Sequence, residues 1–183
     1  MSEIFDLHLQ HGSIKAYPKY KHAHYYLRSV YPMFFEPRRA TTAKILEVGV
    51  AKGGSLRAMR DYFPNAKLVG IDIENHLEGD LSRITFVQGS QNDVEFMTSV
   101  ANEHGPFDFI IEDGSHLFDD QLITTQCMLP ALKVGGIYFV EDVNPNNEGE
   151  KLFEHVKEYY VRWKMNQYSV FFFPWLLAFQ RNT

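Results

Sequence analysis

The sequence has little cysteine and no long apolar run. Its one cysteine, Cys127, cannot form a disulfide within the 183-residue chain, so we expect a reducing, cytoplasmic compartment. The longest apolar stretch, residues 170–179, is interrupted by Pro174 and is shorter than the ~17 to 25 residues of a membrane-spanning helix. The first residues have neither the basic start nor the apolar centre of a secretory leader. We therefore expect a soluble protein with no membrane partner.

Basic residues are also too few to suggest a nucleic-acid partner. The chain has 18 Lys and Arg against 23 Asp and Glu, a net charge of −5, and no basic block. A small-molecule or glycan substrate fits this balance better, and a homo-oligomer remains compatible with it. The length suits one main domain, which we predict over residues 44–183, preceded by a helical or lid segment over residues 1–43.

From Lys44 onward, short apolar runs alternate with segments of helical period, which is typical of an α/β protein with a parallel sheet covered on both faces. Strands are predicted over 44–50, 67–73, 84–89, 107–114 and 136–143, and helices over 55–63, 93–105, 119–136 and 150–165. Residues 168–182 indicate two strands joined tightly around Phe173 and Pro174, and such strands are antiparallel neighbours. The sequence thus predicts a mostly parallel, seven-stranded sheet with an antiparallel last strand.

Capping signals predict where some helices begin and end. Asn92 with Glu95 resembles a capping box, and Gly105 and Gly135 suit helix ends. The segment over residues 1–43 is rich in histidine and tyrosine and lacks strand alternation, so we predict one or two helices over the sheet's carboxyl edge or beside it. Four of its histidines, His8, His11, His22 and His24, match no firm metal-ligand spacing and favour a polar, partly exposed lid.

A glycine turn follows the first predicted strand, in "LEVGVAKGGSL" (residues 46–56). Gly49 and Gly53 would let a ligand approach the backbone, and the helix that follows offers free amides. Asp72 ends the next strand, where an acid can accept both hydroxyls of a ribose or can merely cap a turn. A dinucleotide fingerprint would need glycine at position 51, and this chain has Ala51. Glu47, two residues before Gly49, makes the turn resemble motif I of class I S-adenosylmethionine-dependent methyltransferases.

Acids also end the fourth and fifth predicted strands, in "FIIEDGSH" and "YFVEDV". These strands are neighbours in such a sheet, so Asp113 would lie beside Glu141 and Asp142, while Glu112 turns to the opposite face. Converging carboxylates need a cation, and oxygen ligands suit Mg²⁺, although single acids also cap helices or face water. His116, three residues after Asp113, would be close enough to act as a general base.

"DGSH" followed by "GGIYFVED" is similar to the metal-dependent sugar O-methyltransferases of macrolide tailoring and to the cephalosporin hydroxylase-like group. The resemblance implies Mg²⁺ ligation by Asp113, Glu141 and Asp142, and catalysis by His116 with Asp113. It implies that Ser90 and Gln91, in "FVQGSQND", border the adenine of S-adenosylmethionine. The donor site would comprise Glu47, Gly49, Ala51, Gly53, Ser55, Asp72, Ser90, Gln91 and Asp113, with Lys19, His24 and Tyr26 as weaker candidates.

Three alternatives to a sugar O-methyltransferase remain open from the sequence. A catechol-type or other small-molecule O-methyltransferase would use the same acidic edge. A non-catalytic nucleotide-binding domain would keep the same fold. A dehydrogenase using the glycine turn for NAD is disfavoured by Ala51 and by the lack of a Tyr-x-x-x-Lys pair in sheet context.

Overall fold

The computed structural model describes residues 2–143, 154 and 167–183. The helices are α1 (Glu3–Gln10), α2 (Lys21–Tyr25), α3 (Tyr31–Phe35), α4 (Gly54–Tyr62), α5 (Val94–His104) and α6 (Phe118–Met128), with short 3-10 or π turns over Ile14–Ala16, Tyr26–Val30, Glu36–Arg38 and Leu129–Ala131. The strands are β1 (Lys44–Val48), β2 (Lys67–Asp72), β3 (Ile84–Gln88), β4 (Phe107–Glu112), β5 (Leu132–Glu141), β6 (Tyr168–Phe173) and β7 (Leu176–Arg181). The helix predicted over 150–165 lies, apart from Glu154, outside the described residues.

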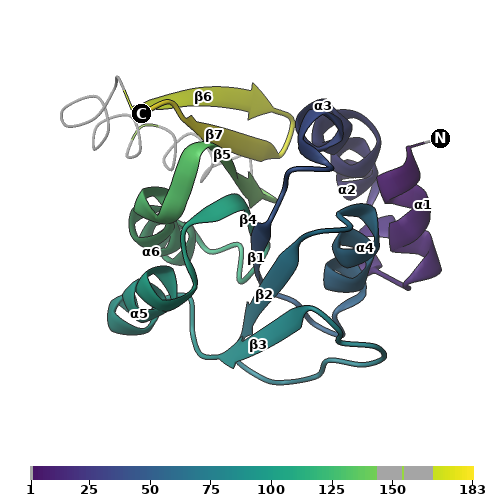
Figure 1. Ribbon diagram of the computed structural model, residues 1–183, viewed down its shortest axis with the longest axis horizontal. Helices are drawn as coiled ribbons and strands as arrows, with labels where there is room; N and C mark the ends of the chain where they lie inside the picture. The colour runs from purple at the N-terminus through teal and green to yellow at the C-terminus, as the bar shows by residue number, and fades with distance from the viewer. Residues whose placement is uncertain (1, 144–153, 155–166) are drawn as a thin grey trace.

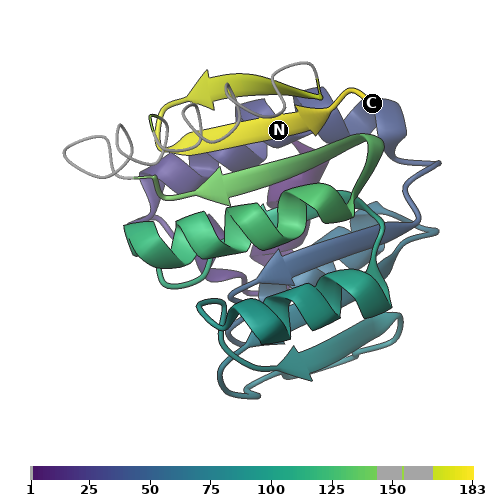
Figure 2. The ribbon, with the colours of Figure 1, turned by 90° about the vertical axis from the view of Figure 1, so that its left-hand side faces the viewer.

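The strands form one seven-stranded sheet in the order β3-β2-β1-β4-β5-β7-β6. Strands β1 to β5 pair in parallel, whereas β7 runs antiparallel to both β5 and β6. The predicted mixed sheet with one reversed strand is therefore confirmed. Because the strand order changes direction between β1 and β4, the carboxyl ends of these two strands border a crevice in which such folds bind ligands. Figure 2 shows the carboxyl ends of the parallel strands along one edge.

Helices cover both faces of the sheet, as the continuous apolar strands require. Helices α5 and α6 lie on one face, and α1 to α4 lie on the other (Figures 1 and 2). Each face has its own buried hydrophobic cluster. The cluster beneath α5 and α6 includes Met97, Val100 and Met128 of these helices. Among the described residues, no helix is long and apolar enough to cross a membrane.

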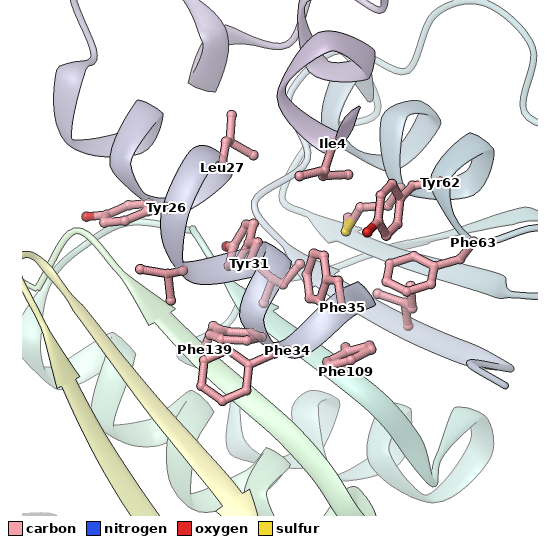
Figure 3. Packing of buried hydrophobic residues seen from close by; sticks show 14 of the residues in the cluster. Ile4, Tyr26, Leu27, Tyr31, Phe34, Phe35, Tyr62, Phe63, Phe109 and Phe139 are labelled. Carbon is pink, nitrogen blue, oxygen red and sulfur yellow. The ribbon is translucent and has the colours of Figure 1, made fainter. Parts of the chain in front are cut away.

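The N-terminal segment packs directly on the sheet. Phe35 lies 4.7 Å from Phe109 and 5.9 Å from Phe139, measured between ring centroids, and it also stacks on Tyr31 (Figure 3). These rings belong to the buried cluster that also holds Tyr62 of α4. The segment is thus helical, as predicted, and lies beside one sheet face with which it shares a core. That this segment forms a lid distinct from the domain of residues 44–183 stays a prediction.

Two capping predictions were wrong. Helix α5 is capped by Asp93, whose side chain accepts a hydrogen bond from the amide of Phe96, and not by Asn92 one residue earlier. The predicted helix over 119–136 ends at Met128, because Pro130 lacks an amide hydrogen and cannot continue the helical hydrogen bonding. Gly135 therefore does not stop a helix: it lies inside β5 with φ +80°, near a register shift in the β4–β5 pairing.

Candidate active site at the carboxyl ends of the strands

A cavity of about 530 Å³ lies at the carboxyl ends of β1, β2, β4 and β5. This volume is within the usual range for a small-molecule or cofactor site. The cavity is lined by six of the predicted donor-site residues: Gly49, Ala51, Asp72, Ser90, Gln91 and Asp113. The acids and the histidine predicted for the chemistry, His116, Glu141 and Asp142, line it as well. One cavity thus joins the glycine turn to the acidic strand ends.

The glycine turn packs against the backbone of Asp113. Gly49 has φ +82°, and a Cβ at this position would lie 2.1 Å from the carbonyl oxygen of Asp113. Only glycine fits such a close approach, which brings the turn after β1 into contact with the end of β4. Gly53, with φ +74°, directly precedes α4. Gly53 and the remaining predicted donor residues, Glu47 and Ser55, are not among the residues that line the cavity, and Glu47 and Ser55 are buried.

Asp72 organises the glycine turn. Its Oδ2 accepts hydrogen bonds from the amides of Val50 and Ala51, each at 3.0 Å, and its Oδ1 accepts one from the amide of Ile73 at 2.8 Å. The carboxylate therefore caps a turn, which was the alternative reading of its position. It also lines the cavity, so a contact with a ribose stays a prediction.

Gln91 and Glu112 form a buried support beneath the cavity. The Gln91 amide donates to Glu112 Oε1 at 3.0 Å, while its oxygen accepts from the Ser115 amide at 2.8 Å. Glu112 turns away from the acidic edge, as predicted, and burial raises its pKa to about 7. Ser90 also lines the cavity, and its hydroxyl donates to Asn92. Gln91 thus fixes the loop that carries Ser115 and His116.

Asp113, His116 and Asp142 form a compact cluster. One possible ligand atom from each lies within 4.8 Å of the others. Nε2 of His116 is 3.9 Å from Oδ1 of Asp113 and 3.8 Å from Oδ2 of Asp142. His116 and Asp142 both adopt left-handed backbone conformations, with φ +60° and +56°. Such conformations are costly for residues other than glycine and often accompany functional sites.

Lys15 is buried among three carboxylates at the same edge. Its Nζ lies 2.6 Å from Glu141 Oε1, and 3.0 and 3.3 Å from carboxylate oxygens of Asp113 and Glu47. Burial alone would lower the pKa of Lys15, but the three negative charges outweigh burial and hold its pKa well above the usual value. The lysine is therefore charged at neutral pH and neutralises part of the acidic edge.

Two tyrosines of the N-terminal segment complete this network. Tyr31 donates a hydrogen bond to the same Glu141 oxygen as Lys15, so Glu141 faces the N-terminal segment. Tyr26 donates to Asp142 Oδ1 at 3.0 Å; burial first, and then the charge of Asp142, raise its pKa, which keeps the hydroxyl protonated. The role of Glu141 as a metal ligand stays a prediction, since the residues clustered around one point are Asp113, His116 and Asp142.

The other predicted N-terminal candidates are divided between the site and its surroundings. His22 lines the cavity, with Nε2 3.2 Å from Asp142 Oδ1. His8, His11 and His24 instead contact Ser13, Asp61 and the carbonyl groups of residues 16 and 17. Lys19 lies over the ring of Tyr20. Sequence reasoning missed Lys15 and Tyr31, and no local spacing marks either residue.

We expect replacement of Lys15 by methionine to destabilise the fold strongly. Lys15→Met keeps a similar side-chain length but leaves three carboxylates without their common cation, at a cost of about 3 to 5 kcal/mol in the free energy of unfolding. Urea denaturation measures this loss. Lys52→Met is the control, because Lys52 and its partner Glu78 are 72% and 61% exposed, and solvent screens such a pair so that its loss should change stability little. Equal losses in the two variants would contradict the stabilising role of Lys15.

Comparison with known proteins identifies the family. The chain belongs to the methyltransferase domain family, whose model matches residues 20–178. It is 35% identical over 133 residues to the mycinamicin VI 2''-O-methyltransferase of Micromonospora griseorubida, covering 69% of this chain and 33% of the relative. It is 38% identical over 121 residues to 8-demethyl-8-(2-methoxy-alpha-L-rhamnosyl)-tetracenomycin-C 3'-O-methyltransferase of Streptomyces olivaceus, covering 62% of this chain and 31% of the relative. The chain thus spans about a third of the length of these curated relatives.

A solved structure confirms the predicted fold. The MycE methyltransferase of the mycinamycin biosynthetic pathway, determined in complex with Mg and SAH, superposes with a TM-score of 0.83 at 24% identity. The match covers 98% of this chain and 55% of that chain. Together with the family match, it confirms the Rossmann-like class I methyltransferase fold. The two curated relatives confirm the predicted resemblance to sugar O-methyltransferases.

Proposed function

We propose that the protein is an S-adenosylmethionine- and Mg²⁺-dependent O-methyltransferase that acts on a hydroxyl of a sugar or of a glycosylated small molecule. One observation carries this proposal: a single cavity contains both the glycine turn and the cluster of Asp113, His116 and Asp142. A nucleotide-binding domain would need the turn but not the cluster. The names of the two curated relatives, both sugar O-methyltransferases, support the same reading.

The residues of the cavity fit the two proposed cofactors. The turn of Gly49 and Ala51, with Asp72 beside it, offers backbone and carboxylate groups to S-adenosylmethionine, which supplies a sulfonium methyl group. Asp113 and Asp142 offer carboxylate oxygens, the ligand type that Mg²⁺ prefers, and their adjacent strand ends bring them within reach of one ion. Bound Mg²⁺ would make a coordinated hydroxyl more acidic.

The protein's own groups would then orient the acceptor and remove its proton. His116 is 40% exposed and faces the cavity, so its Nε2 can reach a hydroxyl placed between Asp113 and Asp142. An aliphatic hydroxyl hardly ionises at neutral pH, and a neutral imidazole at this position can accept its proton as the oxygen attacks the methyl group. Tyr26 and His22 contact Oδ1 of Asp142, whereas His116 lies nearer its Oδ2.

A methyl-transfer assay with defined acceptors tests the proposal. With isotopically labelled S-adenosylmethionine and Mg²⁺, we expect mass-spectrometric detection of a singly methylated product from rhamnosylated or deoxysugar-bearing polyketides. Catechol and caffeoyl acceptors form the comparison arm, because a catechol-type enzyme would use the same acidic edge. Transfer to the catechols alone would contradict the sugar substrate, while binding of S-adenosylhomocysteine without transfer to any acceptor would favour a non-catalytic domain.

A further inference from the structure

Three aromatic rings stand side by side at the acid cluster. The ring of His22 packs edge-on against Tyr20, with centroids 6.1 Å apart, and stacks on Trp175 at 5.7 Å and 29°. Tyr20 and His22 line the cavity, and Trp175, which stacks on His22 without lining the cavity itself, is 39% exposed. We refer to Tyr20, His22 and Trp175 as the aromatic wall. In Figure 1 the turn between β6 and β7, which carries Trp175, lies beside the N-terminal helices.

Polar contacts connect the aromatic wall to Asp142. Nε2 of His22 lies 3.2 Å from Asp142 Oδ1. The carbonyl oxygen of Trp175 accepts hydrogen bonds from the Tyr26 hydroxyl at 2.7 Å and from the Val143 amide at 3.1 Å. The Tyr26 hydroxyl also lies within hydrogen-bond distance of Asp142, as described above. These contacts fix the position of the aromatic wall relative to the cluster of Asp113, His116 and Asp142, where the reacting hydroxyl would lie.

The backbone of Trp175 is in an unfavourable conformation for its residue type. Trp175 has φ +64° in the tight turn between β6 and β7, a left-handed conformation that is unfavourable for residues with a Cβ. Glycine or asparagine would make such a turn with less strain. Burial does not explain the choice of tryptophan either, because more than a third of the residue is exposed. A strained, half-exposed tryptophan beside a reactive cluster is typical of a ligand contact.

We propose that the aromatic wall binds the sugar ring of the acceptor. This inference rests on the proposed function and specifies where its substrate lies. A pyranose ring has a rim of hydroxyl groups and two faces of C–H bonds, so one face can stack on the electron-rich face of an aromatic ring while the rim remains polar. Because the wall adjoins Asp142, a ring stacked on it directs hydroxyls toward Asp142 and His116. The site thereby selects rigid, ring-shaped polyols over open-chain ones.

Trp175 is the residue to test, since His22 also contacts Asp142. We expect Trp175→Leu to raise KM for the glycoside acceptor about 3- to 10-fold, the size of one aromatic contact, with kcat changed less than about 3-fold. Trp175→Phe should restore most of the affinity. Affinities for S-adenosylhomocysteine and for Mn²⁺, measured by calorimetry, should not change in either variant. Phe172→Leu is the matched control, since Phe172 is a 54% exposed aromatic residue of β6 that is not part of the aromatic wall.

A binding experiment decides the question without turnover. Trp163→Phe leaves Trp175 as the only tryptophan, because the chain has two. We expect methyl α-L-rhamnopyranoside to change the fluorescence of this variant saturably and the open-chain polyol D-mannitol to leave it unchanged. An equal response to the two polyols, or no response to the glycoside, would overturn the inference. An unchanged acceptor KM in a folded Trp175→Leu variant would also overturn it, while the proposed function would still stand if glycosides are methylated.

Discussion

Removal of divalent metal should abolish methyl transfer, and added Mg²⁺ should restore it. The physical reason is that Asp113 and Asp142 converge beside the glycine turn, so that their carboxylate oxygens lie around a common point. Without the ion, the acceptor hydroxyl loses several kcal/mol of charge stabilisation, on the order of a 10²- to 10³-fold loss in rate. Initial rates after EDTA treatment and after Mg²⁺ addition measure the effect.

Asp142→Asn should cause the same loss in the presence of Mg²⁺. Asparagine tolerates the left-handed conformation of residue 142, so the backbone should be preserved while the ligand charge is removed. Asp119→Asn is the matched control, because Asp119 is an exposed acid in the first turn of α6 and is not part of the cluster. Binding of S-adenosylhomocysteine should persist in both variants. Full turnover in excess EDTA would refute the metal requirement.

His116→Ala should lower kcat by about 10²- to 10⁴-fold, the range for a positioned proton acceptor, with little change in donor KM. The imidazole lies within 4 Å of carboxylate oxygens of Asp113 and Asp142 and faces the cavity, so it is placed to accept the proton of the acceptor hydroxyl. Steady-state kinetics at saturating Mg²⁺ give kcat, and thermal unfolding of the same samples gives the melting temperature.

A purely structural role for His116 predicts a different pattern. The melting temperature would then fall while kcat per folded molecule stayed close to the wild-type value. Exogenous imidazole should partly rescue His116→Ala if the missing group is a base, and should have no effect if the ring only packs. His76→Ala provides the control, because His76 also lies near an acid, Glu74, but is 62% exposed and does not line the cavity.

The features predicted well from the sequence are those with a local pattern. Short apolar runs located the strands, and the acids that follow β4 and β5 meet at one edge because parallel strands end together. The positions of Asp113 and Asp142 follow from that rule alone. Gly49 was also predictable, since a turn that approaches another backbone this closely requires glycine.

The features that were missed depend on contacts between distant residues or on competing local signals. Lys15 reaches Glu141 across 126 residues, and a lysine in a polar segment carries no sign that it will be buried. Helix α5 could begin at Asn92 or Asp93, and the geometry of the loop selected Asp93. Gly135 had the appearance of a helix end, but Pro130 had already ended the helix and the strand pairing extended back to Leu132.

The distance along the chain between Lys15 and Glu141 has a consequence for biosynthesis. At roughly 5 to 20 residues per second, the ribosome adds Glu141 some 6 to 25 s after Lys15. Early in that interval the lysine lacks both Asp113 and Glu141, and Asp113 is added later in it, before the last strands can close the sheet. The charge balance of the site is therefore established only after Glu141 has been added, and nascent chains halted before residue 141 should lack it.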